Sequence, residues 1–155
     1  MNPVVIVIVK FLHDLFTAVW IGGLLLITLT LFPALKKTLG HSAETEKIMD
    51  AVMMKQGKLV VLAVIVLTLT GILLARSSGN VTGLMRFDSQ YASLLSIKHI
   101  LMIVMVVVAF SRLFGFRGLA SQPNKDRKKL SLLLLHLNTL VGVAVLFLSA
   151  MTATM

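Results

Sequence analysis

Long apolar runs separated by short polar segments make up the hydrophobic pattern of this chain. Four of these runs are long enough, as helices, to cross a hydrocarbon core of about 30 Å. They occupy residues 11–35, 59–75, 90–111 and 130–152. None alternates polar and apolar residues as a strand of a membrane barrel does. The pattern therefore predicts an all-α, integral membrane four-helix bundle, with residues 1–155 forming a single domain.

Composition agrees with a membrane protein. Hydrophobic residues make up 57% of the chain, which excludes an ordinary soluble domain. The absence of cysteine excludes disulfides, thiolate metal sites and thiol catalysis. The net charge of +9 would suit a nucleic-acid-binding protein, but the basic residues flank the apolar runs, where membrane orientation explains them. The expected surroundings are the lipid bilayer of the cell (plasma) membrane, in a multi-pass arrangement, and no nucleic acid.

The distribution of basic residues predicts the orientation. Eleven of the 15 lysines and arginines lie in segments 36–58 and 112–129, on one side of the predicted bundle. Positive charge collects on the cytoplasmic side of membrane proteins, so both termini are predicted to be non-cytoplasmic. Segment 36–58 has room for a short amphipathic cytoplasmic helix. Pro33, near the end of the first run, suits a helix that is about to stop.

Ionisable residues inside the spans are the candidates for chemistry, because such groups are costly in lipid. His13 in the first span and His99 in the third lie near the non-cytoplasmic face at matched depth. His136 enters from the opposite face, roughly 15 Å away along the membrane normal. Two axial ligands of one haem iron must lie about 4 Å apart, since each Fe–N bond is about 2 Å. Only His13 and His99 meet that condition.

Neighbouring residues refine this candidate site. Trp20 shares a helical face with His13, where it either stacks on a flat ligand or packs against other helices. Lys98 projects about 100° from His99, so the two cannot both point squarely at one centre. Lys98 therefore either snorkels to the membrane surface or holds a porphyrin carboxylate. Arg76 and Arg86 are further candidates to neutralise haem propionates.

These residues predict a b-type haem protein with His13 and His99 as axial ligands. Two histidine ligands leave no open position on the iron, which favours electron transfer over oxygen binding. The expected role is electron transfer or redox chemistry near the outer membrane face, with a redox partner protein or a quinone. Whether the protein is an enzyme stays open. The Gly22–Gly23 pair permits close helix contact, within the bundle or in a homo-oligomer.

Copper is the alternative. The chain contains nine methionines, and thioethers bind Cu(I). A copper-transport or copper-resistance protein would use His13, His99, Met102 and Met105. A structural subunit, whose polar groups only hold the helices together, is a further alternative.

The first span also carries a family resemblance. His13 is followed, after six residues, by Trp20, Ile21, Gly22 and Gly23, which resembles the opening helix of the copper resistance protein D family. It also resembles the opening helix of the membrane protoporphyrinogen oxidases that lack flavin. This resemblance implies a four-helix membrane bundle that can hold b-type haem, with His13 as a ligand.

Two further positions extend the resemblance and two depart from it. Lys98 matches a lysine of both families, and the oxidases use the histidine and lysine that match His13 and Lys98 as their functional pair. Asn138, followed by Thr139, resembles the last helix of the copper resistance family, whereas an oxidase would have an Asn–Glu pair there. His99 is an addition beside the lysine. The first departure disfavours the oxidase, and the second favours two histidine ligands.

Overall fold

The computed structural model describes residues 2–77, 87–115 and 125–154, and this part of the chain contains helices and no strand. The helices are α1 (Pro3–Leu25), the π-helical η1 (Leu26–Leu31), α2 (Phe32–Leu39), α3 (Ala43–Ser77), α4 (Gln90–Gly115) and α5 (Lys125–Ala153). The helices α1, η1 and α2 follow one another without a break.

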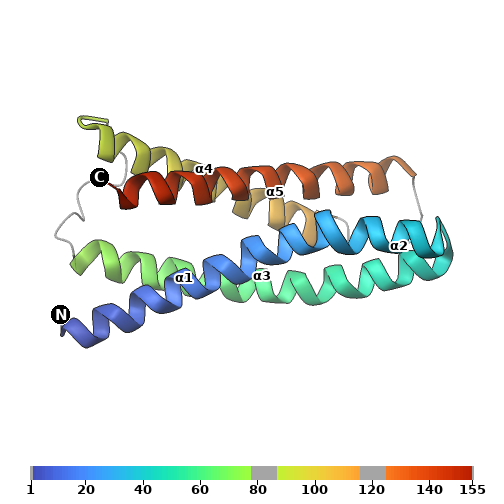
Figure 1. The fold of residues 1–155 in the computed structure, drawn as a ribbon, viewed down its shortest axis with the longest axis horizontal. Helices are drawn as coiled ribbons and strands as arrows, with labels where there is room; N and C mark the ends of the chain where they lie inside the picture. The colour runs from blue at the N-terminus through green and yellow to red at the C-terminus, as the bar shows by residue number, and fades with distance from the viewer. Residues whose placement is uncertain (1, 78–86, 116–124, 155) are drawn as a thin grey trace.

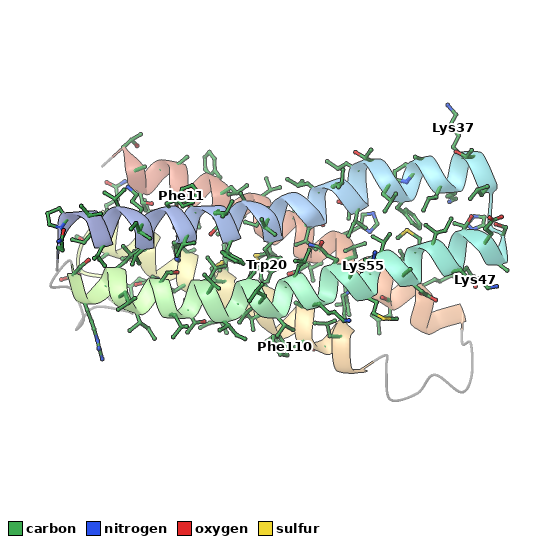
Figure 2. All side chains as sticks on the ribbon, turned by 90° about the horizontal axis from the view of Figure 1, so that it is seen from below. Phe11, Trp20, Lys37, Lys47, Lys55 and Phe110 are labelled. Carbon is green, nitrogen blue, oxygen red and sulfur yellow. The ribbon has the colours of Figure 1, made fainter. Side chains whose placement is uncertain are left out.

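Four helical stretches are long and apolar enough to cross a membrane. They are Pro3–Leu39, Ala43–Ser77, Gln90–Leu113 and Lys129–Ala153. Figure 1 shows them running alternately in opposite directions, with the N- and C-termini at the same end of the bundle. Lys37 and Lys47 lie at the other end (Figure 2). The predicted all-α membrane bundle is confirmed, while the location of the termini outside the cytoplasm stays a prediction.

Capping groups make the helices longer than the apolar runs. α1 begins at Pro3, where the Asn2 side chain accepts a hydrogen bond from the backbone N–H of Val4 at 3.0 Å. α3 begins at Ala43, where Ser42 Oγ accepts from the backbone N–H of Thr45 at 3.2 Å. Segment 36–58 therefore forms no separate amphipathic helix. Its polar residues from position 43 onwards form the first turns of the second span.

The prediction that the first helix stops near Pro33 was wrong. The chain continues as helix to Leu39. The six-residue π-helix η1 ends two residues before this proline. Proline lacks an N–H and clashes with the preceding turn of an α-helix. The wider π-helical turn before Pro33 leaves room for the proline ring and does not need its missing N–H.

The bundle consists of two closely packed antiparallel pairs, α1 with α3 and α4 with α5, joined by contacts of α1 with α5 and of α3 with α4. Within the described residues no Cα atom of α1 lies within 8 Å of a Cα atom of α4, so these two helices occupy diagonal positions and approach each other only through side chains. The core includes Trp20, Ile21 and Met105. At Gly142 of α5 a Cβ would lie 3.2 Å from Ile21 Cγ2 and 3.3 Å from Met105 Cε. Three of the spans therefore meet at this glycine.

Candidate functional site

His13 is held by the neighbouring helix α3. Its Nδ1 lies 2.9 Å from Thr70 Oγ1. The Thr70 hydroxyl donates its own hydrogen to the Val66 carbonyl at 2.7 Å, so its oxygen is free to accept from the imidazole. His13 therefore donates from Nδ1, and Nε2 keeps its lone pair. Such a second hydrogen bond fixes the tautomer and ring orientation of metal-binding histidines.

The His13 imidazole packs against small residues of α3. Thr70 is buried, and its neighbour Gly71 would place a Cβ 3.7 Å from His13 Cε1, at ordinary van der Waals distance. The ring therefore lies directly against α3. Sequence analysis missed Thr70 as part of the site. The signal was present as a threonine beside a glycine in an otherwise apolar run, but nothing in the sequence aligned it with His13.

Replacing Thr70 with valine removes the hydrogen bond at nearly constant volume. For the predicted metal site at His13, we expect the metal affinity to fall by about 10–100-fold, the usual cost of losing a residue that orients a metal ligand. Competition titration with a Cu(I) chelator measures the change. Thr68→Val is the matched control, because Thr68 is exposed and its hydroxyl donates only to the Val64 carbonyl within its own helix. Equal affinities in the two variants would contradict this role for Thr70.

His99 is oriented by its own helix. Its Nδ1 lies 2.7 Å from the Leu95 carbonyl oxygen, which can only accept, so Nε2 carries the lone pair here too. The side chain is half-buried. His136 makes the same bond to the Leu132 carbonyl at 2.7 Å, but its side chain is exposed.

The meeting point at Gly142 gives a common reference for depth. His13 lies eight residues, about 12 Å, from Ile21 in the direction of the termini. His99 lies six residues, about 9 Å, from Met105 in the same direction. His136 lies about 9 Å from Gly142 in the opposite direction. His13 and His99 therefore occupy similar depths on diagonal helices, and their convergence on one metal stays a prediction.

Lys98 belongs to the same region. It is half-buried and lies seven residues before Met105, whose side chain is 0% exposed, so the two share a helical face. Lys98 precedes His99 by one residue and so lies at a similar depth to His13. The structure thus places Lys98 on the inward-facing side of α4, at the level of the two histidines.

Of the remaining predicted site residues, the structure describes Trp20 and Arg76. Trp20 is 1% exposed, and its Nε1 has no hydrogen-bond partner among the described residues. Figure 2 shows it between α1 and α3. Arg76 is exposed near the end of α3. Arg86 lies outside the described residues.

Comparison with known protein families shows to which family the chain belongs. The family model for copper resistance protein D matches residues 50–152, most of the chain. The chain belongs to the copper resistance protein D family. No curated protein and no solved structure matches it. The family is one of multi-pass membrane proteins, in agreement with four helices of spanning length. The resemblance to the flavin-free oxidases has no support from these comparisons.

The family match covers α3, α4 and α5 and so includes Thr70, Lys98 and His99, but not His13. Its name directs attention to copper. Among the described residues, no group of three or more His, Asp or Glu side chains is arranged to hold a metal. A metal ion held by side chains alone in this part of the bundle would draw further ligands, such as methionine thioethers, besides imidazole.

Proposed function

We propose that this copper resistance D protein binds Cu(I) inside the half of the bundle nearest the termini and passes it along the bundle interior as cargo. The observation that carries the proposal is the anchored imidazole of His13. Its Nδ1 is bonded to Thr70 at 2.9 Å, which leaves Nε2 as a ligand held in one orientation. Imidazole and thioether are ligands that suit copper, and membership of the family supports copper over other metals.

Two methionines of α4 extend the donor set toward the bundle centre. Met102 is half-buried one turn beyond His99, and Met105 is fully buried one turn further. Along the helix they lie about 4.5 Å apart, a step that a bound ion can make by exchanging one thioether for the next. Soft thioether sulfur selects Cu(I) over Zn²⁺, which takes four nitrogen, oxygen or thiolate ligands in structural sites. The donor set thus fits copper in its reduced state.

Titration of the purified protein with Cu(I) in the presence of a competing chelator tests this proposal. We expect saturable binding that Zn²⁺ does not displace, weakened at least about tenfold by Met105→Leu, since a soft ligand is lost. Met54→Leu is the control, because Met54 lies on α3 with 52% of its side chain exposed. Absence of saturable Cu(I) binding, or equal affinity in Met54→Leu and Met105→Leu, would contradict the proposal.

Haem is the second candidate, and the diagonal placement of α1 and α4 favours it. Neighbouring helix axes lie about 8–10 Å apart, so diagonal axes lie about 11–14 Å apart, which leaves room for a metal between two imidazoles. His13 and His99 both keep Nε2 free as a ligand. Lys98 and Arg76 carry charge suited to propionates. With both axial positions filled, such a haem would transfer electrons with a protein or quinone partner.

The visible spectrum of the purified protein distinguishes these candidates. A haem protein is red with an intense Soret band, whereas a Cu(I) protein is colourless. If the protein is red, His99→Ala is expected to remove or shift the band, and Lys98→Ala is expected to retain it. The reverse pattern would instead indicate a porphyrin site built from His13 and Lys98. A colourless protein that binds Cu(I) would leave copper as the function.

A further inference from the structure

Several buried polar atoms have no hydrogen-bond partner among the described residues. They are Trp20 Nε1, Gln56 Nε2, Arg112 Nε and both side-chain atoms of Asn138. Buried polar groups are almost always hydrogen-bonded, and leaving one unpaired costs its desolvation free energy. Gln56, Arg112 and Asn138 come from α3, α4 and α5 respectively. We call these three residues the inner polar layer.

Arg112 contacts α3 about one turn from Gln56. Arg112 Nη2 donates to Met53 Sδ at 3.6 Å. Met53 precedes Gln56 by three residues, one turn of α3. The next residues along each helix, Gly57 and Leu113, also abut each other. The guanidinium of Arg112 therefore lies against α3 within a turn of the Gln56 amide.

Asn138 lies at nearly the same depth. The Gln56 amide contacts α1 at Gly23, two residues or about 3 Å beyond Ile21 in the direction away from the termini. Asn138 lies four residues, about 6 Å, beyond Gly142, which contacts Ile21. The depths of Asn138 and the Gln56 amide thus differ by about 3 Å. Asn138 is 1% exposed, so its amide points into the protein interior.

The chemistry of this layer is that of an anion site. A guanidinium keeps its positive charge in a protein and offers only donors, and both amides add N–H groups. Arg112 Nη2 donates to the neutral thioether of Met53. Arg112 is half-buried and its Nε has no partner among the described residues. A charge that is partly removed from water is costly unless it is paired, so a negative counter-charge at Arg112 would stabilise the bundle.

We propose that Gln56, Arg112 and Asn138 bind a small inorganic anion, of the size of a halide, between α3, α4 and α5. The guanidinium supplies the charge, and the two amides donate the remaining hydrogen bonds. The site lies in the half of the bundle away from His13, and it does not depend on copper or haem binding. Buried water is the alternative occupant of such a layer, and water would give no dependence on the anion.

Chloride binding to the full-length protein in detergent tests this site. The protein is prepared in gluconate buffer and titrated with chloride, and the chloride NMR line width is followed. We expect saturable broadening that added iodide removes by competition. The same titration follows the fluorescence of Trp20, the one tryptophan of the chain, as a check that the core stays intact.

Four variants identify the residues responsible. Arg112→Gln is expected to abolish the saturable broadening, and Gln56→Leu and Asn138→Leu to weaken chloride binding at least about tenfold, since each removes a charged or neutral donor to the anion. Lys55→Gln is the control: it removes an exposed positive charge next to Gln56 and should leave binding unchanged. If Arg112→Gln does not fold, the two leucine variants carry the test.

The proposal is overturned by broadening that does not saturate in the wild-type protein, or by chloride affinity that is unchanged in folded Gln56→Leu and Asn138→Leu. His13→Ala should bind chloride as the wild type does. Failure of copper binding and failure of anion binding are therefore separate results.

Discussion

Replacing His13 with alanine is expected to lower the affinity for Cu(I) by more than about a hundredfold. Loss of a residue that only orients a ligand costs about 10–100-fold, so loss of the ligand itself should cost more. The structure adds a reason specific to this protein. His13 is bonded to a neighbouring helix through Thr70, whereas His99 and His136 are bonded to carbonyls of their own helices. Competition titration with a Cu(I) chelator measures the affinity.

His136→Ala is the matched control. This histidine also has Nδ1 bonded at 2.7 Å and Nε2 free, but it is exposed and lies near the other end of the bundle. Its removal should leave the affinity within twofold of wild type, about the scatter between preparations expected for a site it does not touch. If His136→Ala and His13→Ala lose copper equally, the metal is bound at the surface and the proposed function is wrong.

Gly142→Leu is expected to lower the free energy of unfolding by about 1–3 kcal/mol or more, the cost of inserting side-chain volume into a packed core. A Cβ alone at this position would lie 3.2 Å from Ile21 Cγ2 and 3.3 Å from Met105 Cε. A leucine would have to push α5 away from α1 and α4. Helix association in membranes depends on close packing of small residues, so lipid offers no compensation. Thermal unfolding in detergent, followed by circular dichroism, measures the loss.

Gly22→Leu provides the comparison. Gly22 is exposed, and a Cβ there meets nothing within 4 Å, so the same substitution should leave thermal unfolding of the chain nearly unchanged. If Gly22 instead lies in a contact between two copies, the variant would change the oligomeric state without weakening the bundle itself. Equal destabilisation by Gly22→Leu and Gly142→Leu would show that the packing at Gly142 is not the cause.

The same packing links the fold to the proposed copper site. Met105 contacts Gly142 and shares a face with Lys98. A bulky residue at Gly142 should therefore displace a proposed ligand as well as destabilise the protein. Comparing Cu(I) affinity in Gly142→Ala and Gly142→Leu separates these effects, because alanine adds one methyl group and leucine adds four carbon atoms.

The spans were predictable from the sequence, while their ends were only partly so. Apolar length identifies a spanning helix, but α1 and α3 begin with polar caps at Asn2 and Ser42. A hydropathy pattern cannot place such caps, because a polar residue next to an apolar run marks either a loop or a first turn. The hydropathy pattern also could not predict the π-helix before Pro33. A proline in the sequence indicates that an α-helix is interrupted, but it does not show that a wider helical turn lets the helix continue.

The residues of the candidate sites were likewise only partly predictable from the sequence. His13, Lys98 and His99 stand out in the sequence because ionisable groups are rare in apolar runs. Thr70, Gln56 and Arg112 do not, because a threonine in a span and polar residues at a span end are ordinary. Their importance comes from what they face, and Thr70 lies 57 residues from His13 in the chain.

The sequence by itself determined the class of this protein: four membrane helices that run alternately in opposite directions. The reason is that backbone groups in lipid must bond within their own helix, so apolar length alone decides whether a segment spans. The tertiary structure decided which helices are neighbours and how each is rotated. In lipid the outer face of a helix is as apolar as its inner face, so hydrophobicity carries little information about rotation. Packing around Gly142 sets α5 against α1 and α4, and the close packing of α1 on α3 pairs His13 with Thr70.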